Sequence, residues 1–146
     1  MEIQFTVPWS YSDEEDTTFP LPDDYKYWRP LVSHFLKKAD TIEFHCWNKE
    51  QEAIKEIQSI VNCSVHAGDN MTLFQFSNVQ NIQYFLLNKY EIENKFKWFT
   101  VNLIRYGEII FHSGHWATEF AVNAESAEET AWIQSVTPTN TEFLFY

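Results

Sequence analysis

Two histidines at close spacing are the first residues in the chain whose type and arrangement could do chemistry. His112 and His115 are separated by two residues, a spacing that two zinc ligands can have. A metal site needs a third or fourth ligand, and the sequence has no further pair such as C-x-x-C or H-x-x-x-H. We therefore predict no metal site. The other histidines are scattered, and we expect each to face solvent or to be hydrogen-bonded in place: His34, His45 and His66.

Nucleophilic catalysis would need a cysteine or serine activated by a positioned histidine, with an oxyanion site nearby. His45 and Cys46 are adjacent in a stretch that alternates like a strand, so their side chains point to opposite faces and cannot pair. A distant histidine acting on Cys46 or Cys63 is the alternative that this leaves open.

Other catalytic signals are weak. The three glycines stand alone in turn-like segments, which excludes phosphate-binding and dinucleotide-binding loops. Acidic residues are numerous, but none stands in an apolar context that would raise its pKa for acid–base work. We therefore predict that the protein is not an enzyme, has no catalytic residues and takes no cofactor.

The charge of the chain is strongly negative and unevenly distributed. The formal net charge is -11. Residues 1–24 and 106–146 contain seven and six acidic residues and no Lys or Arg, whereas residues 25–105 contain all ten bases and eight acids. Such a field repels nucleic acids and anionic membranes and attracts basic proteins. We expect a basic protein partner, no nucleic acid and no membrane, and leave open a purely solubilising role for the charge.

The acidic side chains near the two ends of the chain are the candidate partner-binding residues. They are Asp13, Glu14, Glu15, Asp16, Asp23, Asp24, Glu125, Glu128 and Glu129. Residues 9–24 lack periodicity and contain two prolines, so we predict a long acidic loop there. Glu125, Glu128 and Glu129 also suit the positive end of a helix, which is their structural alternative.

Residue patterns predict the elements that position these side chains. Alternating apolar residues predict strands, and capping boxes at Asn48, Ser77 and Ser126, with Pro30 at a first helical position, predict helices. The predicted strands are 1–7, 41–47, 63–67, 71–76, 96–105, 108–112, 116–122 and 142–146. The predicted helices run from about 30 to 38, from 48 to 61, from 77 to 90 and from 126 to 135.

The order of these elements predicts one α+β domain over residues 1–146. Its sheet should be mixed but largely antiparallel, include a C-terminal three-strand meander, and pack with about four helices. Two cysteines fit buried free thiols, and no apolar run reaches the ~20 residues of a membrane span. No Lys or Arg precedes Lys26, so a positive signal-peptide region is absent and we expect a cytoplasmic location.

In composition and size, the chain resembles the small immunity proteins by which bacteria neutralise nuclease toxins. The resemblance implies an antitoxin whose acidic surface covers the basic active site of its toxin. One alternative is a phage- or plasmid-encoded DNA mimic, which predicts acids spaced regularly over an elongated face. Another is a small enzyme of unknown substrate, which predicts a pocket with converging polar groups and a perturbed pKa. The oligomeric state and the identity of the partner are left undetermined.

Overall fold

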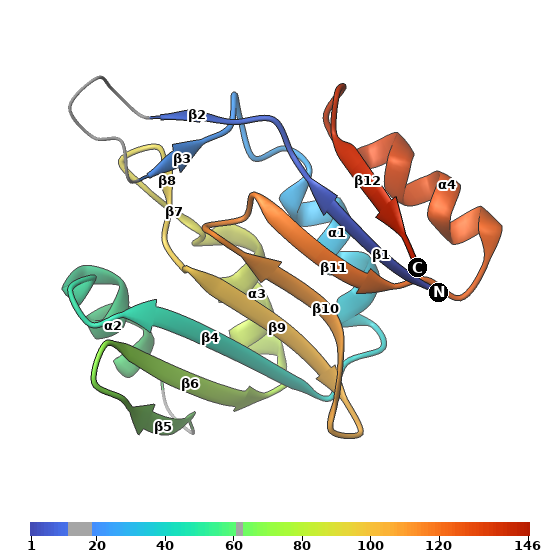
Figure 1. Cartoon of the computed structure of the whole chain (residues 1–146). Coiled ribbons are helices and arrows are strands. Elements are labelled where there is room, and N and C mark those ends of the chain that lie inside the picture. Colours follow the sequence, from blue (N-terminus) through green and yellow to red (C-terminus); the bar gives the residue numbers. More distant parts are fainter. Residues whose placement is uncertain (12–18, 61–62) are drawn as a thin grey trace.

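An eight-stranded sheet in the order β12-β1-β11-β10-β9-β4-β6-β5 forms the centre of the protein. The computed structural model describes residues 1–11, 19–60 and 63–146 (Figure 1). All pairings in this sheet are antiparallel. Its strands are β1 (Glu2–Thr6), β4 (Thr41–Trp47), β5 (Cys63–Ala67), β6 (Met71–Ser77), β9 (Thr100–Arg105), β10 (Glu108–Gly114), β11 (Glu119–Asn123) and β12 (Glu142–Phe145).

Helices cover one face of this sheet. The helices α1 (Trp28–Leu36) and α3 (Gln80–Asn88) lie behind it in Figure 1 and contact each other, whereas α4 (Ala127–Val136) contacts α1 at the β12 edge. The helix α2 (Gln51–Gln58) follows β4 and adds three buried residues to the core. The predicted α+β architecture is confirmed, and its C-terminal meander is β9-β10-β11.

Alternation along the strands explains why only one face is covered. In β4, Ile42, Phe44 and Cys46 are fully buried on the helix side, while the residues between them are half-buried on the other side. Aromatic rings supply much of the core; Trp28, Phe96 and Trp98 pack edge-to-face, with ring centroids 4.6 and 5.5 Å apart. The sheet face that lacks α1 and α3 is called the open face below.

Two of the four helix starts match the sequence closely. Ser126 caps α4, because its Oγ accepts a hydrogen bond from the amide of Glu129 at 3.0 Å. Pro30 is the third residue of α1 and not the first, since the helix begins at Trp28. The amides of the first turn have no intrahelical partner, so proline costs no hydrogen bond at this position either.

The predicted caps of α2 and α3 are wrong. Asn48 does not cap α2, because its Oδ1 accepts a hydrogen bond from Thr72 at 2.7 Å and Glu50 takes the N-cap position. The N-cap of α3 is Val79, whose side chain is exposed and not directed into the core. In both places a tertiary contact or the path of the chain overrides the local pattern.

The segment predicted as a loop over residues 9–24 contains a small hairpin. Its strands are β2 (Ser10–Tyr11) and β3 (Pro20–Leu21). The predicted strand 96–105 is also divided, since β8 (Lys95–Phe96) pairs with β7 (Glu91–Ile92) in a separate hairpin. No helix within the described residues has the length and apolar character needed to cross a membrane.

Candidate functional site

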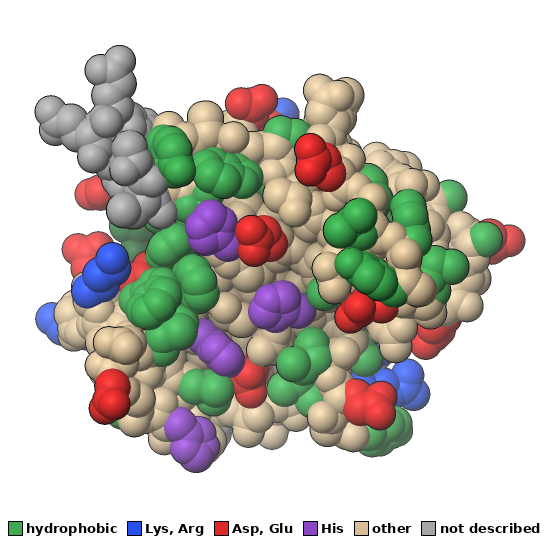
Figure 2. Space-filling model, viewed as in Figure 1, with side chains coloured by type: hydrophobic (Ala, Val, Ile, Leu, Met, Phe, Trp, Pro, Cys, Tyr) green, Lys and Arg blue, Asp and Glu red, His purple; other side chains and the backbone are tan. Residues whose placement is uncertain are grey.

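The open face of the sheet carries a half-buried polar network. Strand register places the side chains of His112, Asn102, Glu43 and Gln75 in one row across four neighbouring strands, β10, β9, β4 and β6. Figure 2 views this face and shows histidine side chains across it, with Lys and Arg side chains at its margins. Polar groups this close together on a sheet face are the strongest candidate for a functional site.

Glu43 is the centre of this network. Its carboxylate accepts hydrogen bonds from His45 Nε2 at 2.7 Å, Asn102 Nδ2 at 3.0 Å and Gln75 Nε2 at 3.2 Å. Burial acts to raise its pKa, but the bonds from His45, Asn102 and Gln75 outweigh burial and hold the pKa below its usual range. Glu43 is therefore an ionised carboxylate that accepts from three neighbours.

The network fixes the protonation of His112. Because Asn102 donates its amide N–H to Glu43, its Oδ1 faces His112 and accepts a hydrogen bond from Nδ1 at 2.6 Å. The proton of the neutral ring is thus on Nδ1, and Nε2 carries a lone pair. Burial first, and then the positive field of His45, lowers the pKa of His112, while Glu119 opposes the shift. Near neutral pH, His112 is an uncharged acceptor.

Gly114 makes room for the His112 ring. A Cβ on Gly114 would lie 2.9 Å from His112 Nε2, closer than side chains tolerate. Within the residues that the structure describes, Nε2 has no hydrogen-bond partner. Next to the ring, Ala121 leaves a hollow of about 470 Å³ that is also lined by Glu2, Ile109 and Asn123.

Acidic and apolar side chains line this hollow and a second one on the same face. Glu119 and Glu142 lie on either side of Thr6 in one cross-strand row, and with Leu144 they line a second hollow of about 240 Å³. Leu144 and Ile109 are more than half exposed, at 59% and 53%. The open face therefore offers carboxylates, an imidazole acceptor and exposed apolar side chains in the same region.

The predicted acidic binding residues that the structure describes lie in two separate places. Asp13, Glu14, Glu15 and Asp16 lie outside the described residues. Asp23 and Asp24 are exposed beside Pro138, where the chain leaves α4. Glu125, Glu128 and Glu129 lie at the other end of α4, whose ten residues span about 15 Å.

Glu129 has cationic partners within the protein. Its carboxylate accepts hydrogen bonds from His34 Nε2 at 2.7 Å, Lys38 Nζ at 3.0 Å and the Glu125 amide at 2.8 Å, and its side chain is only 9% exposed. Although burial acts to raise its pKa, these bonds lower it to about 2. The side chain stabilises the contact between α1 and α4, and Glu125 and Glu128 are the exposed members of this group.

The histidine pair at 112 and 115 does not converge on one point. His115 follows β10, and its Nδ1 lies 3.2 Å from Thr118 Oγ1 and 4.0 Å from Glu119 Oε1. Within the described ranges, no three His, Cys, Asp or Glu side chains are grouped so that they could hold a metal ion.

The cysteines are poorly suited to nucleophilic catalysis. Cys46 is fully buried on the helix side of β4 and His45 is on the open side, as the alternation predicted. Burial, and then the negative charge of Glu50, raises the pKa of the Cys46 thiol to about 12, so the thiolate is scarce at neutral pH. Cys63 is half-buried, and both thiols are free.

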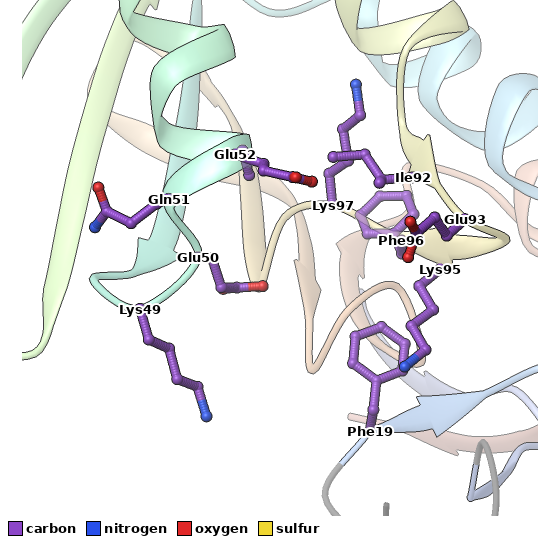
Figure 3. A pocket seen from close by; sticks show the side chains of 11 residues that line it. Phe19, Lys49, Glu50, Gln51, Glu52, Ile92, Glu93, Lys95, Phe96 and Lys97 are labelled. Carbon is purple, nitrogen blue, oxygen red and sulfur yellow. The ribbon is translucent and has the colours of Figure 1, made fainter.

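A separate pocket of about 350 Å³ lies between the start of α2 and the β7–β8 hairpin (Figure 3). Glu50 reaches toward it and accepts hydrogen bonds from the Trp47 amide and Trp116 Nε1, both at 3.0 Å. Burial raises the pKa of Glu50 more than these bonds lower it. The expectation that no acid stands in an environment that raises its pKa is therefore wrong for Glu50.

Positive and negative side chains both line this pocket beside α2. Lys95 Nζ lies 5.3 Å from the centre of the Phe19 ring, and Lys97 forms an ion pair with Glu56. Three lysines and three glutamates line this pocket, so its charges are balanced, whereas Glu2, Glu119 and Glu142 on the open face have no lysine or arginine beside them in the hollows that they line. We therefore place the candidate site on the open face.

Sequence reasoning missed the polar network. Glu43 and Asn102 are 59 residues apart, and only strand register brings them together. The available signal was a set of polar residues at the outward positions of strands whose inward positions are strongly apolar: Glu43, His45, Gln75, Asn102 and His112.

No protein family, curated protein or solved structure matches the chain.

Proposed function

We propose that the protein is an acidic inhibitor that binds a basic protein and covers its active site, in the manner of an immunity protein acting on a nuclease toxin. The observation that carries the proposal is how the fold distributes charge. Strands β12, β1, β11 and β10 all come from the two acid-only segments, and β9, β4, β6 and β5 come from the balanced middle of the chain.

The sheet therefore has an acidic half, which we define as β12, β1, β11 and β10. The two terminal segments that carry no Lys or Arg become neighbours because β1 pairs with both β11 and β12 (Figure 1). A field concentrated on one side of a molecule orients an approaching basic protein and increases its association rate. A nuclease active site is a suitable target, since it carries positive charge for its polyanionic substrate.

The arrangement of the acids favours a protein partner over DNA mimicry. A DNA mimic would need carboxylates at regular spacing along an elongated face. On the acidic half, Glu2, Glu119 and Glu142 are interspersed with the exposed apolar side chains of Ile109 and Leu144. Exposed apolar side chains among polar groups are typical of protein–protein interfaces.

The small-enzyme alternative draws on one specific observation, the oriented imidazole of His112 beside a hollow. Such a ring is a suitable general base. Within the described residues, however, no hydroxyl or thiol is hydrogen-bonded to its Nε2. The Lys or Arg of the neighbouring strands β9 and β11 is Arg105, which is at the far end of β9 and is paired with Glu108, whereas His112 is paired with Asn102.

Gene neighbourhood gives a direct test. Each gene adjoining this one in its native genome is expressed in a test host, alone and together with this chain. We expect one product to be toxic alone, growth to be restored by co-expression, and the purified pair to bind with an affinity that falls as salt rises. The proposal is overturned if a toxic neighbour remains toxic, or if no neighbour is toxic.

A further inference from the structure

The open face of the acidic half has a chemistry that selects the kind of group that can bind it. The strands of the eight-stranded sheet contain a single Lys or Arg, which is Arg105. Because Arg105 directly follows the open-face residue Ile104, alternation assigns its side chain to the opposite face, and its guanidinium contacts the Tyr106 ring. Glu2, Glu119 and Glu142 lie on the open face, and no described Lys or Arg of these strands balances them.

The imidazole of His112 adds a further acceptor. Its Nδ1 proton is donated to Asn102, so Nε2 can only accept a hydrogen bond while the ring is neutral. Carboxylates also only accept. A surface that combines such acceptors and has no Lys or Arg on its strands is complementary to a donor-rich cation. The arginine guanidinium, with five N–H groups, is the strongest protein example.

Apolar side chains give this surface a second means of binding. Ile109 and Leu144 are each more than half exposed, and each lines one of the two hollows. The aliphatic stem of a bound Lys or Arg side chain would pack on such residues while its charged end reaches a carboxylate. The row Glu142, Thr6 and Glu119 spans two strand spacings, about 10 Å, so two separate cationic side chains fit along it.

We infer that the basic partner docks on the open face of the acidic half, with Glu119, Glu142 and His112 Nε2 accepting hydrogen bonds from its Arg or Lys side chains. This inference rests on the proposed function and identifies its binding surface. It places the contact on acidic residues of the sheet that were not among the candidate binding residues named from the sequence.

A defined cationic peptide tests this surface without knowledge of the partner. The probe is acetyl-Arg-Leu-Arg-Arg-amide, and the matched control peptide has citrulline, an uncharged analogue of arginine, in place of each arginine. We expect the arginine peptide to shift the NMR signals of β1, β10 and β11 and of the His112 ring, with saturation. The citrulline peptide should shift none of them. Equal binding of both peptides would contradict the inference.

Paired variants locate the site. Replacing Glu119 and Glu142 together by Gln should weaken binding of the arginine peptide about tenfold, and His112→Phe, which keeps a ring above Gly114, about fivefold. The matched control is Glu125→Gln with Glu128→Gln, which removes two exposed acids at the start of α4 and should leave binding unchanged. If only the α4 pair weakens binding, the inference is wrong.

The toxin assay separates this inference from the proposed function. If the wild-type chain relieves the toxicity of a neighbouring gene product and the Glu119→Gln, Glu142→Gln variant relieves it equally, the docking surface is wrong while the inhibitor function stands. If the variant fails while the α4 control variant succeeds, both are supported. If the wild-type chain itself fails, the proposed function is wrong whatever the peptide binds.

Discussion

Two acidic regions of this protein differ in what their carboxylates contact. At the start of α4, Glu129 is almost fully covered and lies within 3.0 Å of both His34 Nε2 and Lys38 Nζ. On the open face, Glu119 is 61% exposed, and its carboxylate lies 4.0 Å from His115 Nδ1. The first carboxylate is neutralised inside the fold, whereas the second faces outward with little compensation.

This difference shows that a count of acids does not locate a binding surface. Both regions belong to the segment 106–146, which contains no Lys or Arg, so the sequence makes them look alike. Packing of α1 on α4 brings Lys38 to Glu129, whereas no Lys or Arg among the described residues forms an ion pair with Glu119. Mutations in the two regions should therefore affect different properties, stability in one and binding in the other.

The largest effect on stability should come from Glu129→Gln. The substitution removes a covered negative charge and leaves Lys38 and His34 without their shared partner, so the free energy of unfolding should fall by about 2 kcal/mol. Urea unfolding followed by circular dichroism measures it. The matched control is Glu128→Gln, an exposed neighbour that should change the free energy by less than about 0.5 kcal/mol. Equal losses in both variants would contradict a specific role for Glu129.

The same carboxylate should make stability depend on pH in an acidic window. The folded pKa of Glu129 is about 2 against an ordinary 4.5, so the folded state favours the ionised form. Its contribution is therefore complete above about pH 4.5 and is lost as the pH falls toward 2. The difference in stability between wild type and Glu129→Gln should shrink over this window. A difference that stays constant from pH 6 to pH 3 would contradict the assignment.

Ser126→Ala should have a smaller effect in the same region. The hydroxyl satisfies the amide of Glu129, which has no partner within the helix, and its loss should cost ~1 kcal/mol. Ser135 is a matched control, because its hydroxyl bonds a backbone carbonyl near the other end of the same helix and caps no amide. If Ser135→Ala costs as much as Ser126→Ala, the effect is not one of capping.

Local patterns in the sequence predicted much of the fold. Alternation placed β1 and β4 within a residue or two, because each of these strands has a strongly apolar inner face. Helix starts were harder to predict. Asn48 is of a residue type that often caps helices, but its side-chain oxygen accepts a hydrogen bond from Thr72, 24 residues further along the chain. A local motif cannot reveal a competing partner that only the fold brings near.

The candidate site was less predictable for the same reason. Thr6 lies between Glu119 and Glu142 only because β1 is placed between β11 and β12, an order that no periodicity in the sequence specifies. Likewise, Lys38 and Glu129 are 91 residues apart, so their pairing could not be inferred from the acidic cluster in which Glu129 occurs. The charge distribution was visible in the sequence, but its division between the two halves of the sheet was not.

The smallest effect on stability should come from neutralising the open face. Replacing Glu119 and Glu142 by Gln removes two exposed charges that have no close Lys or Arg in the described structure, so little attraction is lost. The same change reduces repulsion within an acidic half that also contains Glu2 and Glu108. We expect the free energy of unfolding to stay within about 0.5 kcal/mol of wild type, or to rise slightly at low salt. A loss comparable to that of Glu129→Gln would mean that these carboxylates stabilise the fold and would remove the contrast between the two acidic regions.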